Sequence, residues 1–278
     1  MGKIEKGKQL TNIMPGNTES FRVTEVSEVD KNGKYFFRAK GEVSGYETAD
    51  FVEDENNVTL EESEYRRQRS GMPDAYMAKT GKDFDWSVYG DDAGVQTTKD
   101  LLNRFIMEFR HQEIAGRGLY IYSWTKGSGK TLLACCIANE VIKRYDINVK
   151  FISMSDYLQK VADKSETARE EVKAIREATL LIVDDIGATT TYKDWDREKI
   201  LALVDFRYKR KLLTIYTSNV ESLELKCGDR AVERIYADTL DIKLPEVNVR
   251  RMKADKYKQE EIKNMLEKVQ ELREDTAF

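Results

Sequence analysis

Cysteine and histidine are scarce in this chain, which limits the metal chemistry that it can carry. The 278 residues include three cysteines and a single histidine, His111. No Cys-x-x-Cys pair occurs, and the adjacent Cys135 and Cys136 lie within a helical pattern that is typical of buried thiols. We therefore expect no structural zinc site and a cytoplasmic location.

Long apolar runs are also missing from the sequence. No stretch approaches the roughly 20 apolar residues that span a bilayer. Residues 1–10 contain lysines but lack the apolar core of a secretory signal. We expect neither a membrane segment nor a membrane partner.

Neither sign of charge dominates the composition. The 46 Lys and Arg residues are nearly balanced by 50 Asp and Glu residues, and the net charge is -4. Contact with nucleic acid would therefore depend on local basic patches. The densest is residues 207–211, Arg-Tyr-Lys-Arg-Lys, which suit either phosphate contact with base stacking or the C-terminal end of a helix. We favour the helix end.

The first 62 residues indicate a small β-rich module. Short alternating runs occur at 21–26 and 34–38, and Asn32-Gly33 between them is a hairpin signal. Residues 58–69 then read as a short charged helix.

Two further segments flank the largest part of the chain. Residues 63–98 form a linker whose glycines and aromatics show no clear period, and we expect it to lie on the following domain. The main domain extends over 99–251, and a charged C-terminal helix covers 252–278. That helix carries a heptad-like apolar spacing, which suits packing on its own domain or a partner-binding coil; we favour packing on its own domain.

The main domain alternates between strand and helix patterns, after a first helix at 99–111. Continuous apolar runs predict strands at 119–123, 149–153, 180–184, 212–217 and 239–244. Helix patterns lie between them, at 130–145, 155–178, 195–210 and 221–236. This order predicts an α/β fold with a parallel sheet sandwiched by helices.

A glycine-rich loop follows the first of these strands and leads into a helix. Strand, loop, Lys-Thr and helix together are typical of a triphosphate-binding device. Lys130 is placed to reach the β- and γ-phosphates, and the Thr131 hydroxyl to bind Mg²⁺. Trp124 replaces the first glycine of the strict motif, which is tolerable if the chain keeps a negative φ there. The candidate nucleotide-binding residues are Thr125, Lys126, Gly127, Ser128, Gly129, Lys130, Thr131 and Leu132.

Polar side chains end two later strands. Asp184 and Asp185 follow the apolar strand that starts at Leu180. Because ligands bind at the carboxyl ends of parallel strands, we expect Asp184 to bind Mg²⁺ and Asp185 to orient or deprotonate the attacking water. Asn219 ends the next strand, where it suits either the attacking water or a helix N-cap.

Two arginines share one face of the helix pattern at 221–236. Arg230 and Arg234 are four residues apart. An arginine presented to a neighbouring subunit's γ-phosphate is a strong electrostatic catalyst. The alternative is a surface ion pair with Asp229 or Glu233.

These motifs, in this order, resemble the AAA+ bacterial helicase loaders of the DnaC/DnaI type, over about residues 65–251. The resemblance implies an AAA+ P-loop NTPase domain with ATP and Mg²⁺ as cofactors. It also implies Walker A at 127–131, Walker B at Asp184 and Asp185, and sensor 1 at Asn219. The arginine finger would be Arg234 or Arg230, and the sensor 2 arginine would be Arg250.

The resemblance further implies a weak ATPase that delivers the hexameric replicative helicase onto single-stranded DNA and self-associates through its ATPase domain. The module at 1–62 would bind the helicase, as in loaders of phages and mobile elements. Two alternatives remain: an IstB-like transposition helper that binds double-stranded DNA, and an ATP-gated adaptor with little hydrolysis.

Overall fold

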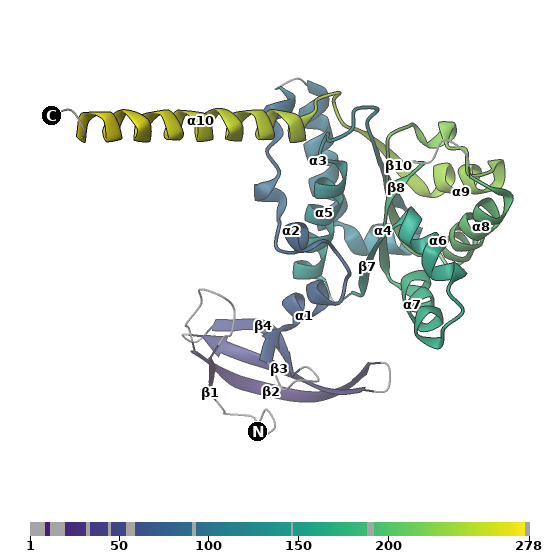
Figure 1. Ribbon diagram of the computed structural model, residues 1–278. Coiled ribbons are helices and arrows are strands. Elements are labelled where there is room, and N and C mark those ends of the chain that lie inside the picture. The colour runs from purple at the N-terminus through teal and green to yellow at the C-terminus, as the bar shows by residue number, and fades with distance from the viewer. Residues whose placement is uncertain are drawn as a thin grey trace.

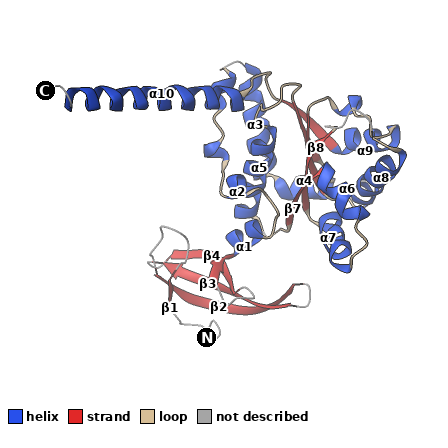
Figure 2. Ribbon diagram, in the orientation of Figure 1, coloured by secondary structure: helices blue, strands red, loops and turns tan. Residues whose placement is uncertain are grey.

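The computed structural model describes residues 9–11, 20–31, 34–43, 46–53, 59–90, 93–145, 147–187 and 192–275. Figure 1 shows the arrangement of these segments, and Figure 2 separates helices from strands.

A parallel sheet forms the centre of the main domain, as the alternating pattern predicts. Its strands are β6 (Gly118–Tyr122), β7 (Val149–Ser153), β8 (Leu180–Ile186), β9 (Leu213–Ser218) and β10 (Thr239–Lys243). The spatial order is β10-β6-β9-β8-β7, and every neighbouring pair is parallel. The carboxyl ends of β6, β8 and β9 therefore lie side by side at one edge.

Helices cover both faces of this sheet (Figure 1). Their bounds are α3 (Ala93–Met107), α4 (Phe109–Ala115), α5 (Lys130–Arg144), α6 (Met154–Ala162), α7 (Glu166–Glu177), α8 (Asp194–Lys209) and α9 (Asp229–Asp238). Successive strand residues point to opposite faces. Leu119 and Ile121 thus join the core under α3 and α5, while Tyr120 and Tyr122 join the core under α6 to α9.

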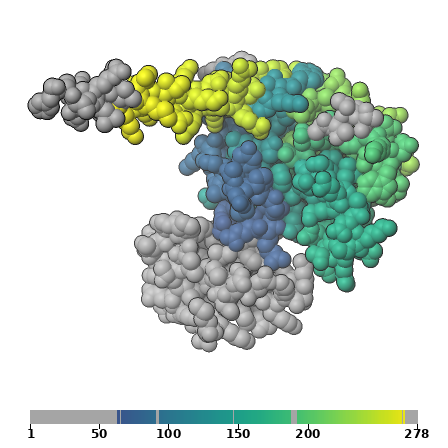
Figure 3. Space-filling model, in the orientation of Figure 1, coloured from purple at the N-terminus to yellow at the C-terminus, as the bar shows by residue number. Residues whose placement is uncertain are grey.

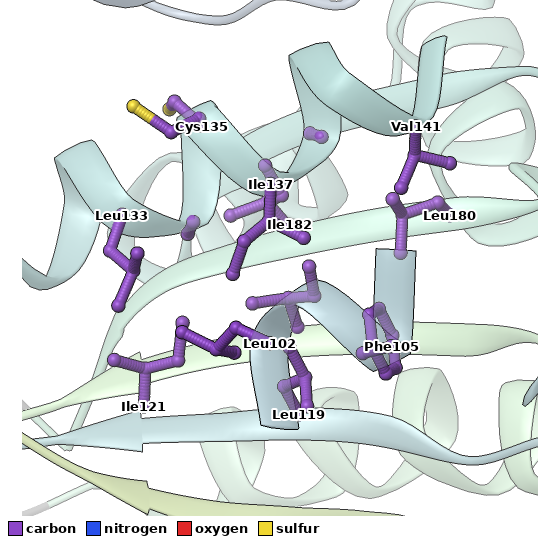
Figure 4. Close-up of a cluster of buried hydrophobic side chains, with 14 of the residues drawn as sticks. Leu102, Phe105, Leu119, Ile121, Leu133, Cys135, Ile137, Val141, Leu180 and Ile182 are labelled. Carbon is purple, nitrogen blue, oxygen red and sulfur yellow. The ribbon is translucent and has the colours of Figure 1, made fainter. Parts of the chain in front are cut away.

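The core under α5 fixes the helix that starts at the glycine-rich loop. Leu133, Ile137 and Val141 of α5 lie in one buried cluster with Leu180 and Ile182 of β8 (Figure 4). Burying each such side chain contributes about 1.5–3 kcal/mol. The loop is therefore held between a buried strand and a buried helix.

Two of the helices predicted after the glycine-rich loop differ from the structure. The helix expected at 155–178 is two helices, α6 and α7, because Ser165 caps a new helix by accepting a hydrogen bond from the Ala168 N–H at 3.2 Å. The helix expected at 221–236 begins only at Asp229, after a short 3₁₀ turn, η3 (Ser222–Glu224). Gly228, at φ 102°, separates the two.

The helix predicted at 99–111 begins earlier, at Ala93, and ends at Met107. A second short helix, α4, follows after Glu108. The two helices nevertheless place Phe105 and Phe109 in one buried cluster, with ring centroids 6.2 Å apart.

The N-terminal part is a second, antiparallel sheet. It contains β1 (Gln9–Thr11), β2 (Ser20–Lys31), β3 (Lys34–Val43), β4 (Tyr46–Glu53) and β5 (Thr59–Glu61), paired in sequence order. The expected β-rich module is therefore present, although the Asn32-Gly33 turn lies outside the described residues. The helix expected at 58–69 is shorter, α1 (Glu62–Gln68), because β5 occupies residues 59–61.

The segment between α1 and α3 lies on the main domain, as expected. It contains α2 (Asp74–Met77) and two 3₁₀ turns, η1 (Gly81–Asp83) and η2 (Trp86–Tyr89). Phe84 and Tyr89 are buried in the core under α5, and their rings stack at 5.7 Å. Asn139 of α5 donates to the carbonyls of Tyr76 and Lys79 at 2.9 and 2.7 Å.

The basic run at 207–211 is largely committed to internal contacts. Arg207 is buried, and its guanidinium donates to the carbonyls of Arg176, Ala178 and Leu213 and to the Thr214 hydroxyl. Lys209, the last residue of α8, forms an ion pair with Asp205 at 2.7 Å. The helix-end interpretation is thus confirmed for Lys209, whereas Arg207 turns inward.

Beyond its first turn, the C-terminal helix α10 (Val249–Asp275) does not pack on its own domain over residues 251–266, contrary to the interpretation that we favour from sequence. Residues 250–266 are exposed, and Tyr257 and Ile262 are 67% and 57% accessible. Figure 3 shows this stretch projecting from the body. In the ranges that the structure describes, no helix is both long and apolar enough to cross a membrane.

Candidate nucleotide-binding site

The glycine-rich loop joins the carboxyl end of β6 to the first turn of α5. Gly127 and Gly129 have φ of 78° and 90°, a region that favours glycine. A Cβ on Gly129 would lie 2.7 Å from the Tyr89 hydroxyl and one on Gly127 2.7 Å from the Asn248 side chain, so both glycines also permit close packing. The described non-glycine residues with positive φ are Asp185 and Lys211, so Trp124 keeps a negative φ as expected.

Lys130 is the first residue of α5 and its ammonium group lies within the loop. It donates to the carbonyls of Ser123 and Thr125 at 3.1 and 3.0 Å and to the Ser128 hydroxyl at 3.2 Å. Burial lowers the pKa of Lys130, although the carboxylates of Asp185, Glu246 and Asp184 act in the opposite direction. The Lys130 ammonium is a compact positive charge, which is the type of group that binds a phosphate.

Asp184 ends the buried part of β8 and faces α5. Its Oδ1 accepts hydrogen bonds from the hydroxyls of Thr131 at 2.8 Å and Thr217 at 2.6 Å. Burial raises the pKa of Asp184 and the two hydrogen bonds oppose that rise. A hydroxyl and a carboxylate side by side are oxygen ligands of the kind that Mg²⁺ takes, so the donor set fits this ion.

Asp185 has a strained backbone, and its side chain has different partners from that of Asp184. Its φ of 56° lies in the left-handed region, and the pairing of β8 with β9 shifts register between Val183 and Ile186. The Asp185 N–H donates to the Thr217 hydroxyl at 2.9 Å. The Asn219 side-chain amide donates to Asp185 Oδ1 at 3.0 Å, so the two residues form one exposed pair.

The beginning of α10 lies against the loop. The Arg250 N–H donates to the Gly127 carbonyl at 3.1 Å. Arg250 also acts on Lys130 as a like charge, lowering its pKa. This places Arg250 beside the phosphate-binding residues.

Arg230 and Arg234 lie on α9, on the sheet face opposite α5. Arg234 forms an ion pair with Asp205 at 2.8 Å, and its guanidinium lies 5.6 Å from the Tyr208 ring centroid. Arg230 is exposed. Neither has a hydrogen bond to the loop among the contacts of the described residues.

Two residues at this site are missed by sequence reasoning. The Tyr89 hydroxyl donates to the Ser128 carbonyl at 2.5 Å, and the Glu246 carboxylate accepts from the N–H groups of Trp124 and Thr125. Glu246 is distant from the loop in sequence, and no local pattern marks it. Tyr89 belongs to an aromatic segment that the sequence does show.

The sheet order, with the glycine-rich loop after β6 and the carboxylates after β8, defines a P-loop NTPase of the AAA+ class. The profile of the IstB-like ATP binding protein family matches residues 47–231. The chain belongs to this family of ATP-binding proteins.

Curated relatives include two replicative helicase loaders. DnaI of Bacillus subtilis is 28% identical over 114 residues, which cover 40% of this chain and 36% of DnaI. DnaC of Escherichia coli is 30% identical over 122 residues, which cover 42% of this chain and 49% of DnaC. The chain thus spans less than half the length of these relatives.

Solved structures share the fold. The crystal structure of DnaI has a TM-score of 0.53 at 24% identity and covers 63% of this chain and 95% of that one. The DnaC helicase loader has a TM-score of 0.52 at 21% identity and covers 62% and 99%. DnaA of Aquifex aeolicus, solved with AMPPCP, has a TM-score of 0.50 at 22% identity and covers 69% and 56%.

Proposed function

We propose that this protein is an ATP-dependent loader that binds the hexameric replicative helicase and delivers it onto single-stranded DNA. The arrangement of Lys130, Thr131, Asp184, Asp185 and Asn219 at one sheet edge carries the ATPase part of the proposal. The similarity to two helicase loaders supports the loading part. In this proposal the domain at 99–251 is the ATPase.

The remaining parts have complementary roles in the proposal. The module at 1–62 binds the helicase, the linker at 63–98 joins it to the ATPase, and the helix at 252–278 extends from it. The protein acts in the cytoplasm and self-associates through the ATPase domain. Arg234, or Arg230, then reaches the nucleotide of a neighbouring subunit, and Arg234 leaves its ion pair with Asp205 to do so.

Within one subunit the residues divide the work on ATP. The backbone N–H groups of the loop and Lys130 bind the phosphates, and Arg250 contributes a second positive charge. Thr131 and Asp184 would hold Mg²⁺, and the bound ion would supply positive charge beside the phosphate oxygens. Asp185 accepts a proton from the attacking water, while Asn219 fixes the orientation of the Asp185 carboxylate.

Retention of the replicative helicase of the source organism on the immobilised protein is the direct test of loading. We expect retention, and we expect the captured complex to bind single-stranded DNA in preference to duplex DNA. Absence of helicase binding both with and without ATP would refute the loader assignment.

A transposition helper is the second candidate, because the matching family is described as IstB-like. That function requires ATP-dependent binding to double-stranded DNA. Strong duplex binding without helicase retention would favour it. An ATP-gated adaptor would instead retain the helicase and bind ATP with almost no turnover.

Substitution Lys130→Ala is expected to weaken ATP binding by about 10- to 100-fold, because it removes the charged donor from the loop. Helicase retention should persist, since the proposed helicase-binding module is a different part of the chain. Titration with ATP measures the first effect and pull-down the second. Lys143→Ala, which replaces an exposed lysine on the same helix, is the matched control. Equal ATP affinity in the Lys130 and Lys143 variants would contradict the assignment of the loop.

A further inference from the structure

The Glu246 carboxylate lies on the first residues of the phosphate-binding loop. Its Oε1 accepts from the Trp124 N–H at 3.2 Å, and its Oε2 accepts from the Thr125 N–H at 2.6 Å. The Ser123 hydroxyl also donates to Oε2, at 3.0 Å. One side chain thus receives three donors from three consecutive residues.

These hydrogen bonds stabilise the ionised form of Glu246. Burial would raise the pKa of this carboxyl, but the hydrogen bonds from Thr125, Ser123 and Trp124 together lower it. Ser123 is itself fully buried, and its hydroxyl oxygen accepts from the Thr125 N–H at 3.2 Å. The Thr125 N–H is therefore shared between the Ser123 hydroxyl and the Glu246 carboxylate.

The contact falls where the loop departs from the strict motif. Trp124 occupies the position of the first glycine, and its side chain turns away from the loop. The Lys243 ammonium lies 4.2 Å from the centroid of its ring, and the Tyr122 ring lies edge-on at 5.8 Å. At this position the Glu246 carboxylate binds the backbone N–H, and the Trp124 ring packs against Lys243 and Tyr122.

The segment that carries Glu246 is fixed on both sides of this contact. The Leu244 N–H donates to the Tyr122 carbonyl at 2.8 Å, and the Arg250 N–H donates to the Gly127 carbonyl at 3.1 Å. The segment 244–250 therefore runs along the loop with backbone hydrogen bonds at its two ends. Glu246 between them has a defined place.

We propose that Glu246 is a positioning residue for nucleoside triphosphate binding. Its carboxylate fixes the backbone of Trp124 and Thr125, and the Thr125 carbonyl in turn holds the Lys130 ammonium at 3.0 Å. The inference rests on the proposed function of the loop as an ATP site. The hydrogen bonds that the described residues donate to Glu246 all come from residues 123–125 at the entry of the loop, so its loss should affect binding rather than the chemical step.

The test compares full-length wild-type protein with Glu246→Ala and Glu246→Gln, titrated with Mg·ATP. Because hydrogen bonds to a charged group are worth about 1.5–3 kcal/mol, we expect the Kd for ATP to rise by about 10- to 100-fold in Glu246→Ala. Glu246→Gln keeps the size and one acceptor, and its Kd should rise less, by about 3- to 10-fold. Turnover at saturating ATP should stay within about threefold.

Glu224→Gln is the matched control. Among the hydrogen bonds of the described residues, this carboxylate accepts from the Trp124 ring nitrogen, at 3.5 Å, and from no backbone donor of the loop. Its Kd should equal that of the wild type. Thermal unfolding without nucleotide should show a slightly lower melting temperature for Glu246→Gln than for Glu224→Gln, because hydrogen bonds to a charged group are lost. The further stabilisation by added ATP should also be smaller in Glu246→Gln.

Wild-type affinity in both Glu246 variants would overturn the inference, as would equal losses in Glu246→Gln and Glu224→Gln. Failure of the wild-type protein itself to bind ATP is a different outcome. It would refute the nucleotide assignment of the loop, and with it the proposed function.

Discussion

We expect substitution Asp185→Asn to reduce ATP turnover by about 10²- to 10⁴-fold, the usual contribution of a general base, while the Kd for ATP should change by less than about threefold. The introduced amide is nearly isosteric with the carboxylate, but it is neutral and does not accept a proton. We assign the base to Asp185 and not to Asp184 because of their positions. The Asp184 carboxylate accepts hydrogen bonds from Thr131 and Thr217. Asp185 is the exposed carboxylate beside Asn219.

The backbone at Asp185 gives a second measurement. Its φ of 56° is unfavourable for an aspartate, at an order of 1–3 kcal/mol, and favourable for glycine. We expect Asp185→Gly to raise the melting temperature and to lose turnover as fully as Asp185→Asn. Steady-state kinetics and thermal unfolding measure the two effects. Glu198→Gln, which replaces an exposed carboxylate on α8, is the control. Unchanged turnover in Asp185→Asn would show that another group accepts the proton.

Substitution Arg207→Met is expected to lower the free energy of unfolding by about 3 kcal/mol, the scale set by its buried hydrogen bonds. The side chain is 1% exposed, and burial lowers the pKa of Arg207 to about 10, so the guanidinium stays charged at neutral pH. Its donors satisfy the carbonyls of Ala178 and Leu213 at 2.9 and 2.5 Å and the Thr214 hydroxyl at 2.8 Å. Each buried acceptor left without a donor costs about 1–3 kcal/mol, which outweighs the relief of removing a buried cation.

Chemical denaturation followed by circular dichroism measures this loss. The matched control is Arg210→Met, three residues further along, where the exposed guanidinium stacks on Phe206 at 3.9 Å. That variant should lose less than about 1 kcal/mol, as cation–π contacts at exposed sites do. Equal stabilities of the two variants would mean that Arg207 contributes no more than a surface arginine.

The strands of the main domain could be predicted because each is buried on both faces and reads as a continuous apolar run. Strand β7, at Val149–Ser153, has the predicted bounds. Helix boundaries were harder, because Ser165 starts a new helix inside an unbroken helical pattern. Gly228 likewise delays the start of α9 without changing the apolar period.

The residues of the site fall into the same two groups: those that a local sequence motif marks, and those that are brought in by contacts between distant segments. The position of Lys130, Thr131, Asp184 and Asn219 at one sheet edge could be predicted from sequence, because each lies in a motif next to a strand end. Glu246 could not be found, because its role comes from a contact across 122 positions of the chain. A residue such as Glu246 contacts the loop only because the fold brings a distant segment beside it. The sequence alone does not show which distant segment this is.

The hydrogen bond from the Arg250 N–H to the Gly127 carbonyl connects the first turn of α10 directly to the phosphate loop. With 27 residues and a rise of about 1.5 Å for each, the helix is about 40 Å long. A rotation of about 10° at its first turn would therefore move its far end by about 7 Å. A displacement of the phosphate loop that rotated α10 by this angle would thus be enlarged to the width of a side chain at the other end of the helix.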